Sequence, residues 1–175
     1  MQYRGRIEDF NNNAHVFEKY LRGEEENRST DRIEGALIEG RCTGAGSLRF
    51  KERAIAKGIP SKNFRRPFDL PAPRDPLDAH LNLSTVGLGT YLGKPDDEDD
   101  FDLYIALKYL IKSSTLNVID TAINYRCQKA ERTIGSVLRT LLVDEPTMGS
   151  EDSEKISRDE LFISSKNGYV PDDSD

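Results

Sequence analysis

Residues 117–125 read NVIDTAINY, a short run of strand-forming residues that ends in a carboxylate, Asp120, followed five positions later by the phenol of Tyr125. A strand that stops at Asp120 places this carboxylate at its C-terminal end, where open α/β sheets and β/α barrels hold their catalytic groups. A second run, LFISSK at 161–166, also ends on a charged residue, Lys166. We therefore expect a carboxylate, a phenol and an ammonium to meet at one edge of a parallel sheet.

These three groups suit the donation of a proton to a substrate. A tyrosine, with an ordinary pKa of about 10, is a poor proton donor at neutral pH, and a neighbouring ammonium stabilises its phenolate. In this interpretation Lys166 assists Tyr125, and Asp120 holds the lysine in place.

The second half of the chain alternates predicted strands and helices. A strand at 85–89 precedes a helix at 101–112, and the strand that ends at Asp120 precedes a helix at 129–142 with apolar residues on one face. The order strand, helix, strand, helix, strand is typical of an α/β fold. Gly135, in the middle of the second helix, indicates a close approach of that helix to the sheet.

Four motifs in this order resemble the first part of an aldo-keto reductase. They are VGLGT at 86–90, D-T-A-x-x-Y from Asp120, E-x-x-I-G-x-x-L from Glu131, and FISSK at 162–166. The resemblance implies a partial (β/α)8 TIM barrel, with its first three βα units in residues 79–175. It also implies an oxidoreductase that reduces a small aldehyde or ketone with NADPH.

The resemblance also implies roles for individual residues. The family's catalytic tetrad is Asp, Tyr, Lys and His, and the first three correspond to Asp120, Tyr125 and Lys166. The cofactor contacts correspond to Gly89, Thr90, Tyr91 and Asp120. The histidine belongs to a fourth barrel strand, whereas the sequence has 175 residues and a complete barrel needs about 250. We therefore expect these residues to be a truncated part of a barrel, inactive by themselves and prone to associate.

Two other interpretations remain open. Gly87, Gly89 and Gly93 approximate a dinucleotide-binding glycine loop, with Asp120 as the ribose-binding acid. This alternative is less favoured because the acids at 96–100 would repel a pyrophosphate, although they suit the positive end of a helix dipole. The second alternative is a non-catalytic relative of the aldo-keto reductases that binds or regulates a partner.

Residues 1–78 form a predicted N-terminal extension, mainly helical and partly disordered, with a proline-rich linker at its end. The firmest helix in it runs from Ser47, a candidate N-cap, to Lys57, before Gly58. In the family, the segment before the first barrel strand often forms a hairpin that covers the barrel's N-terminal end. Residues 81–84 are a candidate for its second strand.

Composition excludes several classes of partner. The formal net charge of −6 argues against nucleic acid, and no apolar run approaches the length of about 20 residues that spans a bilayer. The first residues resemble neither a secretory signal nor a transit peptide, so a cytoplasmic location is expected. Cys42 and Cys127, the two cysteines, are expected to be free thiols, and neither they nor the two histidines show the spacing of a metal site.

Overall fold

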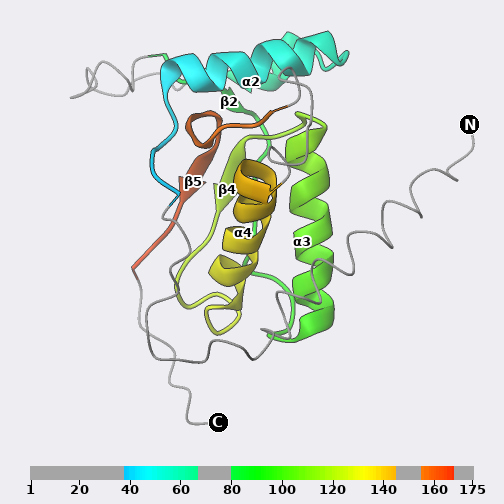
Figure 1. Ribbon diagram of the computed structural model, residues 1–175, viewed down its shortest axis with the longest axis vertical. Helices are drawn as coiled ribbons and strands as arrows, with labels where there is room; N and C mark the ends of the chain where they lie inside the picture. Colours follow the sequence, from blue (N-terminus) through cyan, green and yellow to red (C-terminus); the bar gives the residue numbers. More distant parts are fainter. Residues whose placement is uncertain (1–37, 67–79, 145–154, 168–175) are drawn as a thin grey trace, which may run out of the picture.

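The computed structural model describes residues 38–66, 80–144 and 155–167 and has a mixed α/β architecture (Figure 1). The predicted α/β class is therefore confirmed. Most of the N-terminal extension, the proline-rich linker and most of the loop before the last strand lie outside the described residues. None of the helices within the described ranges combines the length and apolar character needed to cross a membrane.

Three short strands form a parallel sheet in the order β3, β4, β5. Their register sets Gly89 beside Asp120 and Asp120 beside Ser164, so all three strands end at the same edge. The strands within the described ranges do not close into a barrel. Their bounds are Leu88–Gly89 for β3, Val118–Asp120 for β4 and Phe162–Ser164 for β5.

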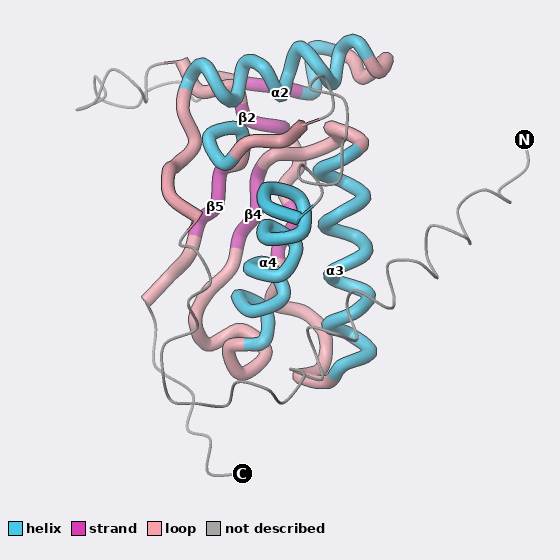
Figure 2. The backbone as a smooth tube through the Cα atoms, viewed as in Figure 1, coloured by secondary structure: helices cyan, strands magenta, loops and turns pink. Residues whose placement is uncertain are grey.

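Two helices, α3 (Asp97–Lys112) and α4 (Lys129–Arg139), run beside this sheet and pack on each other (Figures 1 and 2). Ile119, in the central strand, is 1% exposed and belongs to the same apolar core as buried side chains of both helices. Deep between the helices, the Tyr104 hydroxyl is hydrogen bonded to Thr140 Oγ1 at 2.9 Å. The apolar stripes seen in the sequence thus face the sheet, as amphipathic helices require.

The ends of α3 and α4 refine the sequence predictions. α3 begins at Asp97, four residues before the predicted start, because Asp96 accepts a hydrogen bond from the Asp99 amide and caps the helix. Four acids in its first turn stabilise the helix dipole, as predicted. α4 ends at Arg139 and continues as a π-helical turn, Thr140–Asp144.

The close approach to the sheet that was predicted from Gly135 is wrong. This residue is exposed, and a Cβ there would meet no atom within 4 Å.

Helix α2, Gly44–Ala56, lies across the N-terminal end of the parallel strands (Figure 1). It begins before Ser47, the predicted N-cap. The Thr43 hydroxyl caps the helix instead, because it accepts a hydrogen bond from the Gly46 amide at 3.0 Å. Ser47 is buried instead, where its hydroxyl accepts the Asn82 amide. Gly58, with a φ of +87°, follows the helix as predicted.

A second, two-stranded sheet lies near α2. β1 (Phe64–Arg65) pairs antiparallel with β2 (Leu83–Ser84), which confirms the strand expected at 81–84. Asn117, at the start of the central parallel strand, joins the two sheets because its side chain accepts the Ser84 amide at 2.9 Å and donates to the carbonyls of Asn82 and Glu160. Asn117 is fully buried, so these hydrogen bonds satisfy an amide that has no access to water.

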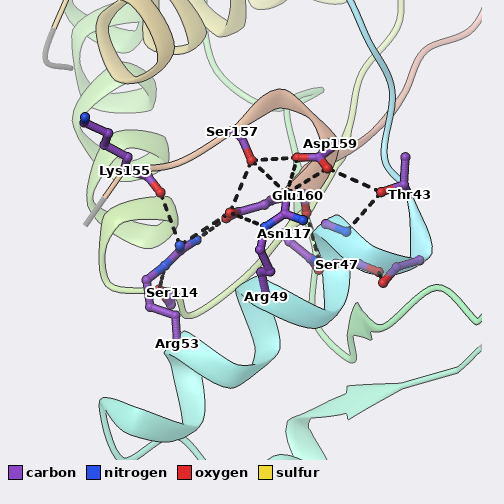
Figure 3. A network of polar contacts seen from close by, with 12 residues as sticks. Thr43, Ser47, Arg49, Arg53, Ser114, Asn117, Lys155, Ser157, Asp159 and Glu160 are labelled. Atoms are coloured by element: carbon purple, nitrogen blue, oxygen red, sulfur yellow. Dashed lines mark hydrogen bonds and ion pairs between the residues drawn. The ribbon is translucent and has the colours of Figure 1, made fainter. Parts of the chain in front are cut away.

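Charged groups fix α2 to the segment before β5 (Figure 3). Arg53 forms an ion pair with Glu160, whose side chain is 3% exposed, and Arg49 contacts Asp159 at 2.7 Å. Burial acts to raise the pKa of Asp159, but hydrogen bonds from Ser157 and Arg49 outweigh it and hold this pKa below its usual value. Helix α2 is therefore held at the end of the sheet opposite to the C-terminal strand ends.

Candidate functional site

The C-terminal ends of β4 and β5 bring Asp120 and Lys166 together. Lys166 Nζ donates to both carboxylate oxygens of Asp120, at 2.7 and 2.8 Å, and to the carbonyl oxygen of Thr121 at 3.0 Å. Backbone hydrogen bonds from Thr121 to Ser164 and from Ile123 to Lys166 extend the pairing beyond the strands. The predicted proximity of the carboxylate and the ammonium is confirmed, and the sheet register explains it.

Tyr125 completes the predicted trio. It lies in the turn that follows β4, and Lys166 Nζ is 5.2 Å from the centre of its ring. The ring of Tyr91, which follows β3, meets the Tyr125 ring edge to face, with centroids 5.1 Å apart and an interplanar angle of 68°. The C-terminal edge of the parallel sheet, together with the segments that directly follow its strands, is called the rim below, and it carries two aromatic rings and a cation. The Tyr91 side chain is largely in solvent, at 66% exposure.

The electrostatics of the rim favour a charged lysine. The hydrogen bond with Asp120 is the main cause that raises the pKa of Lys166 above its ordinary value, and the phenol of Tyr125 adds to this rise despite an opposing effect of burial. Lys166 is therefore an ammonium at neutral pH, held against one carboxylate and beside one phenol.

Two other residues predicted at the site differ in their surroundings. Gly89 lies at the exposed end of β3, and a Cβ there would meet nothing within 4 Å. Thr90 is 2% exposed, and its hydroxyl donates to the Asp120 carbonyl at 3.2 Å and contacts the Thr121 hydroxyl at 3.0 Å. The structure thus places the Thr90 side chain inside the sheet, where it ties the end of β3 to the end of β4.

The segment that carries Lys166 is also fixed to helix α4. Ser165 donates a hydrogen bond to Glu131, which lies in the first turn of that helix, at 2.5 Å. The contact of Glu131 with Ser165 had no signal in the sequence, because the two residues are 34 positions apart.

A buried ion pair between Arg126 and Asp100, close to Tyr125, was not predicted from the sequence. Arg126 follows Tyr125 directly, and its guanidinium lies 2.5 Å from the carboxylate of Asp100 in α3, with side chains 1% and 5% exposed. In the sequence the acids at 96–100 indicated only a favourable interaction with the helix dipole. The signal that could have indicated a partner for one of these acids is the basic residue directly after Tyr125.

The two cysteines differ in their exposure. Cys42 is buried and Cys127 exposed, and the two are not joined in a disulfide bond. The part of the chain that the structure describes contains no group of three or more histidine, cysteine, aspartate or glutamate side chains able to hold a metal ion.

Comparisons with models of protein families, with curated proteins and with solved structures find no match.

Proposed function

We propose that the chain carries the Asp–Tyr–Lys part of a carbonyl-reducing site of aldo-keto reductase type, on the first three βα units of a TIM barrel. The observation that carries this proposal is the contact of Lys166 with both carboxylate oxygens of Asp120, at 2.7 and 2.8 Å, and its place 5.2 Å from the Tyr125 ring centre. Parallel strands that end together at this rim, and the antiparallel pair β1–β2 before them, agree with that architecture.

Each member of the trio has a distinct role in the proposed reaction. Tyr125 donates a proton to the carbonyl oxygen of the substrate. Lys166 stabilises the phenolate that this donation leaves, because a cation near a phenolate favours its charged form. Asp120 orients the ammonium toward the phenol and keeps it protonated, in line with the raised pKa of Lys166.

The surroundings of the trio fit a nicotinamide cofactor. NADPH, when bound, supplies the hydride that reduces the carbonyl carbon. The exposed ring of Tyr91 beside Tyr125 offers an aromatic wall for a flat ring, and the open space at Gly89 lets a ligand approach the end of β3. Thr90 contributes indirectly, because its buried hydroxyl fixes the carbonyl of Asp120.

The test of this proposal is the Tyr125→Phe variant of the full-length protein. We expect it to lose NADPH oxidation driven by aldehydes or ketones while its affinity for NADPH, measured by fluorescence titration, stays nearly unchanged, because the phenol acts on the substrate oxygen. The matched control is Tyr109→Phe, which removes a half-exposed phenol on α3. It should keep wild-type turnover.

Two results would contradict the proposal. Retention of most of the turnover by Tyr125→Phe would show that Tyr125 is not the proton donor. A wild-type protein that binds NADPH but turns over none of a broad panel of aldehydes and ketones would instead favour a non-catalytic, partner-binding relative.

A further inference from the structure

Arg126 connects the two loops that carry the aromatic rings of the rim. Its guanidinium is paired with Asp100 at 2.5 Å, and its Nε donates to the carbonyl oxygen of Lys94 at 3.0 Å. Lys94 lies three residues after Tyr91, whereas Arg126 is the residue after Tyr125. The buried Arg126 side chain therefore contacts the loop that carries the Tyr91 ring. The Arg126 backbone directly follows Tyr125, which carries the second ring.

The backbone at Arg126 has an uncommon conformation. Arg126, Cys127 and Gln128 have φ values of +52°, +52° and +69°, so three consecutive residues other than glycine adopt left-handed conformations. Such residues each cost of order 1 kcal/mol or more and persist only where the surroundings fix them. The ion pair of Arg126 is one such constraint, and it lies at the first of the three positions.

The acid that receives Arg126 is itself held from a second side. Lys129, at the start of α4, contacts Asp100 at 3.3 Å and Asp97 at 2.9 Å. The loop after β3 is tied to α3 as well, because the Lys94 amide donates to the Asp99 carboxylate. The start of α3 thus fixes the β3–α3 loop and the turn after β4 in one arrangement.

We infer that Arg126 is a positioning residue that sets the contact between the Tyr91 and Tyr125 rings and thereby the place of the Tyr125 phenol beside Lys166. The catalytic consequence rests on the proposed function, whereas the ring contact does not. A purely stabilising ion pair would leave the rings in contact in a folded variant, whereas a positioning residue lets the rings move apart when its guanidinium is removed and the fold is kept.

The experiment compares three variants of the full-length protein. Arg126→Met keeps a long side chain but removes both polar contacts. Asp100→Asn is milder, because it leaves the hydrogen bond from Arg126 to Lys94. Tyr104→Phe is the matched control, since it removes the buried hydrogen bond to Thr140 between α3 and α4 without touching either loop.

The first readout is the nuclear Overhauser contact between the two tyrosine rings, with the rings labelled and the assignment made from Tyr91→Phe and Tyr125→Phe. We expect this contact in the wild type and in Tyr104→Phe, a marked weakening in Asp100→Asn, and its loss in Arg126→Met. If the proposed activity holds, kcat should fall by roughly tenfold to a hundredfold in Arg126→Met with a smaller change of KM, because small misplacements of catalytic groups are costly.

The outcomes separate the two claims. Loss of the ring contact in a protein whose wild type has no reductase activity supports the positioning role and refutes the proposed function. An unchanged ring contact in folded Arg126→Met overturns the inference. If Arg126→Met does not fold, Asp100→Asn decides, and an undiminished contact in that variant has the same meaning.

Discussion

Lys166 Nζ lies 2.7 Å from one carboxylate oxygen of Asp120 and 2.8 Å from the other, across the ends of the neighbouring strands β4 and β5. This contact is the main cause of the raised pKa of Lys166. A raised lysine pKa means that the favourable interaction is complete below the ordinary value of 10.5 and is lost as the pH rises through the higher, folded-state value.

Asp120→Asn should therefore make Lys166 more reactive. Removal of the carboxylate charge lowers the pKa of Lys166, so a larger fraction of free amine exists at a given alkaline pH and acylation is faster. Peptide mapping after brief treatment with an acylating reagent measures this rate. Lys57, which follows α2 at the opposite end of the sheet, serves as the internal reference. An unchanged Lys166 rate relative to Lys57 would contradict the assignment of this pair.

Substitution of two helical glycines by alanine should have opposite effects. At Gly46 in α2, a Cβ would overlap the backbone carbonyl group of Asp159, so Gly46→Ala should destabilise the protein by about 1–3 kcal/mol or displace the helix. At Gly135 in α4 the space is open, and Gly135→Ala should stabilise it by about 0.8–1 kcal/mol through helix propensity. Urea unfolding of both variants measures the difference. A stabilising Gly46→Ala would show that α2 does not pack against Asp159 as described, and a destabilising Gly135→Ala would show that the space at Gly135 is not open.

The ion pair that anchors α2 should matter more than its exposed neighbour. Glu160→Gln leaves the Arg53 guanidinium, whose side chain is 13% exposed, without its charged partner and should cost about 3 kcal/mol in the free energy of unfolding. Arg49→Met removes a guanidinium that is 50% exposed and should cost less than about 1 kcal/mol. Equal losses in chemical denaturation would mean that burial does not distinguish the two pairs.

The residues at the rim could be predicted from the sequence better than the long-range contacts that hold the surrounding elements in place. A strand that ends in a carboxylate and another that ends near a lysine suffice to place Asp120 and Lys166, because parallel strands in register end together. Local signals also located α3 and α4. Such signals follow from periodicity and capping, which involve residues within a few positions of each other.

The missed features depend on distant residues. Thr43 rather than Ser47 caps α2, and the Ser47 hydroxyl instead accepts a hydrogen bond from the amide of the distant residue Asn82. The Arg126 contact with Asp100 joins residues 26 positions apart, and no local pattern specifies it. Gly135 illustrates the opposite error, since a helical glycine suggested close packing where the helix faces solvent.

The attachment of α2 has a consequence for the order of folding. Its hydrogen bonds to the segment before β5 span up to 116 residues, whereas the hydrogen bond between Tyr104 and Thr140 spans 36. Since the cost of loop closure grows with length, local contacts form first and long-range contacts such as these form late. On the ribosome, α2 emerges long before Asp159 and Glu160 are made. Until Asp159 and Glu160 are made, Arg49 and Arg53 lack these partners. We therefore expect this part of the attachment of α2 to form last, after its contact with Asn82.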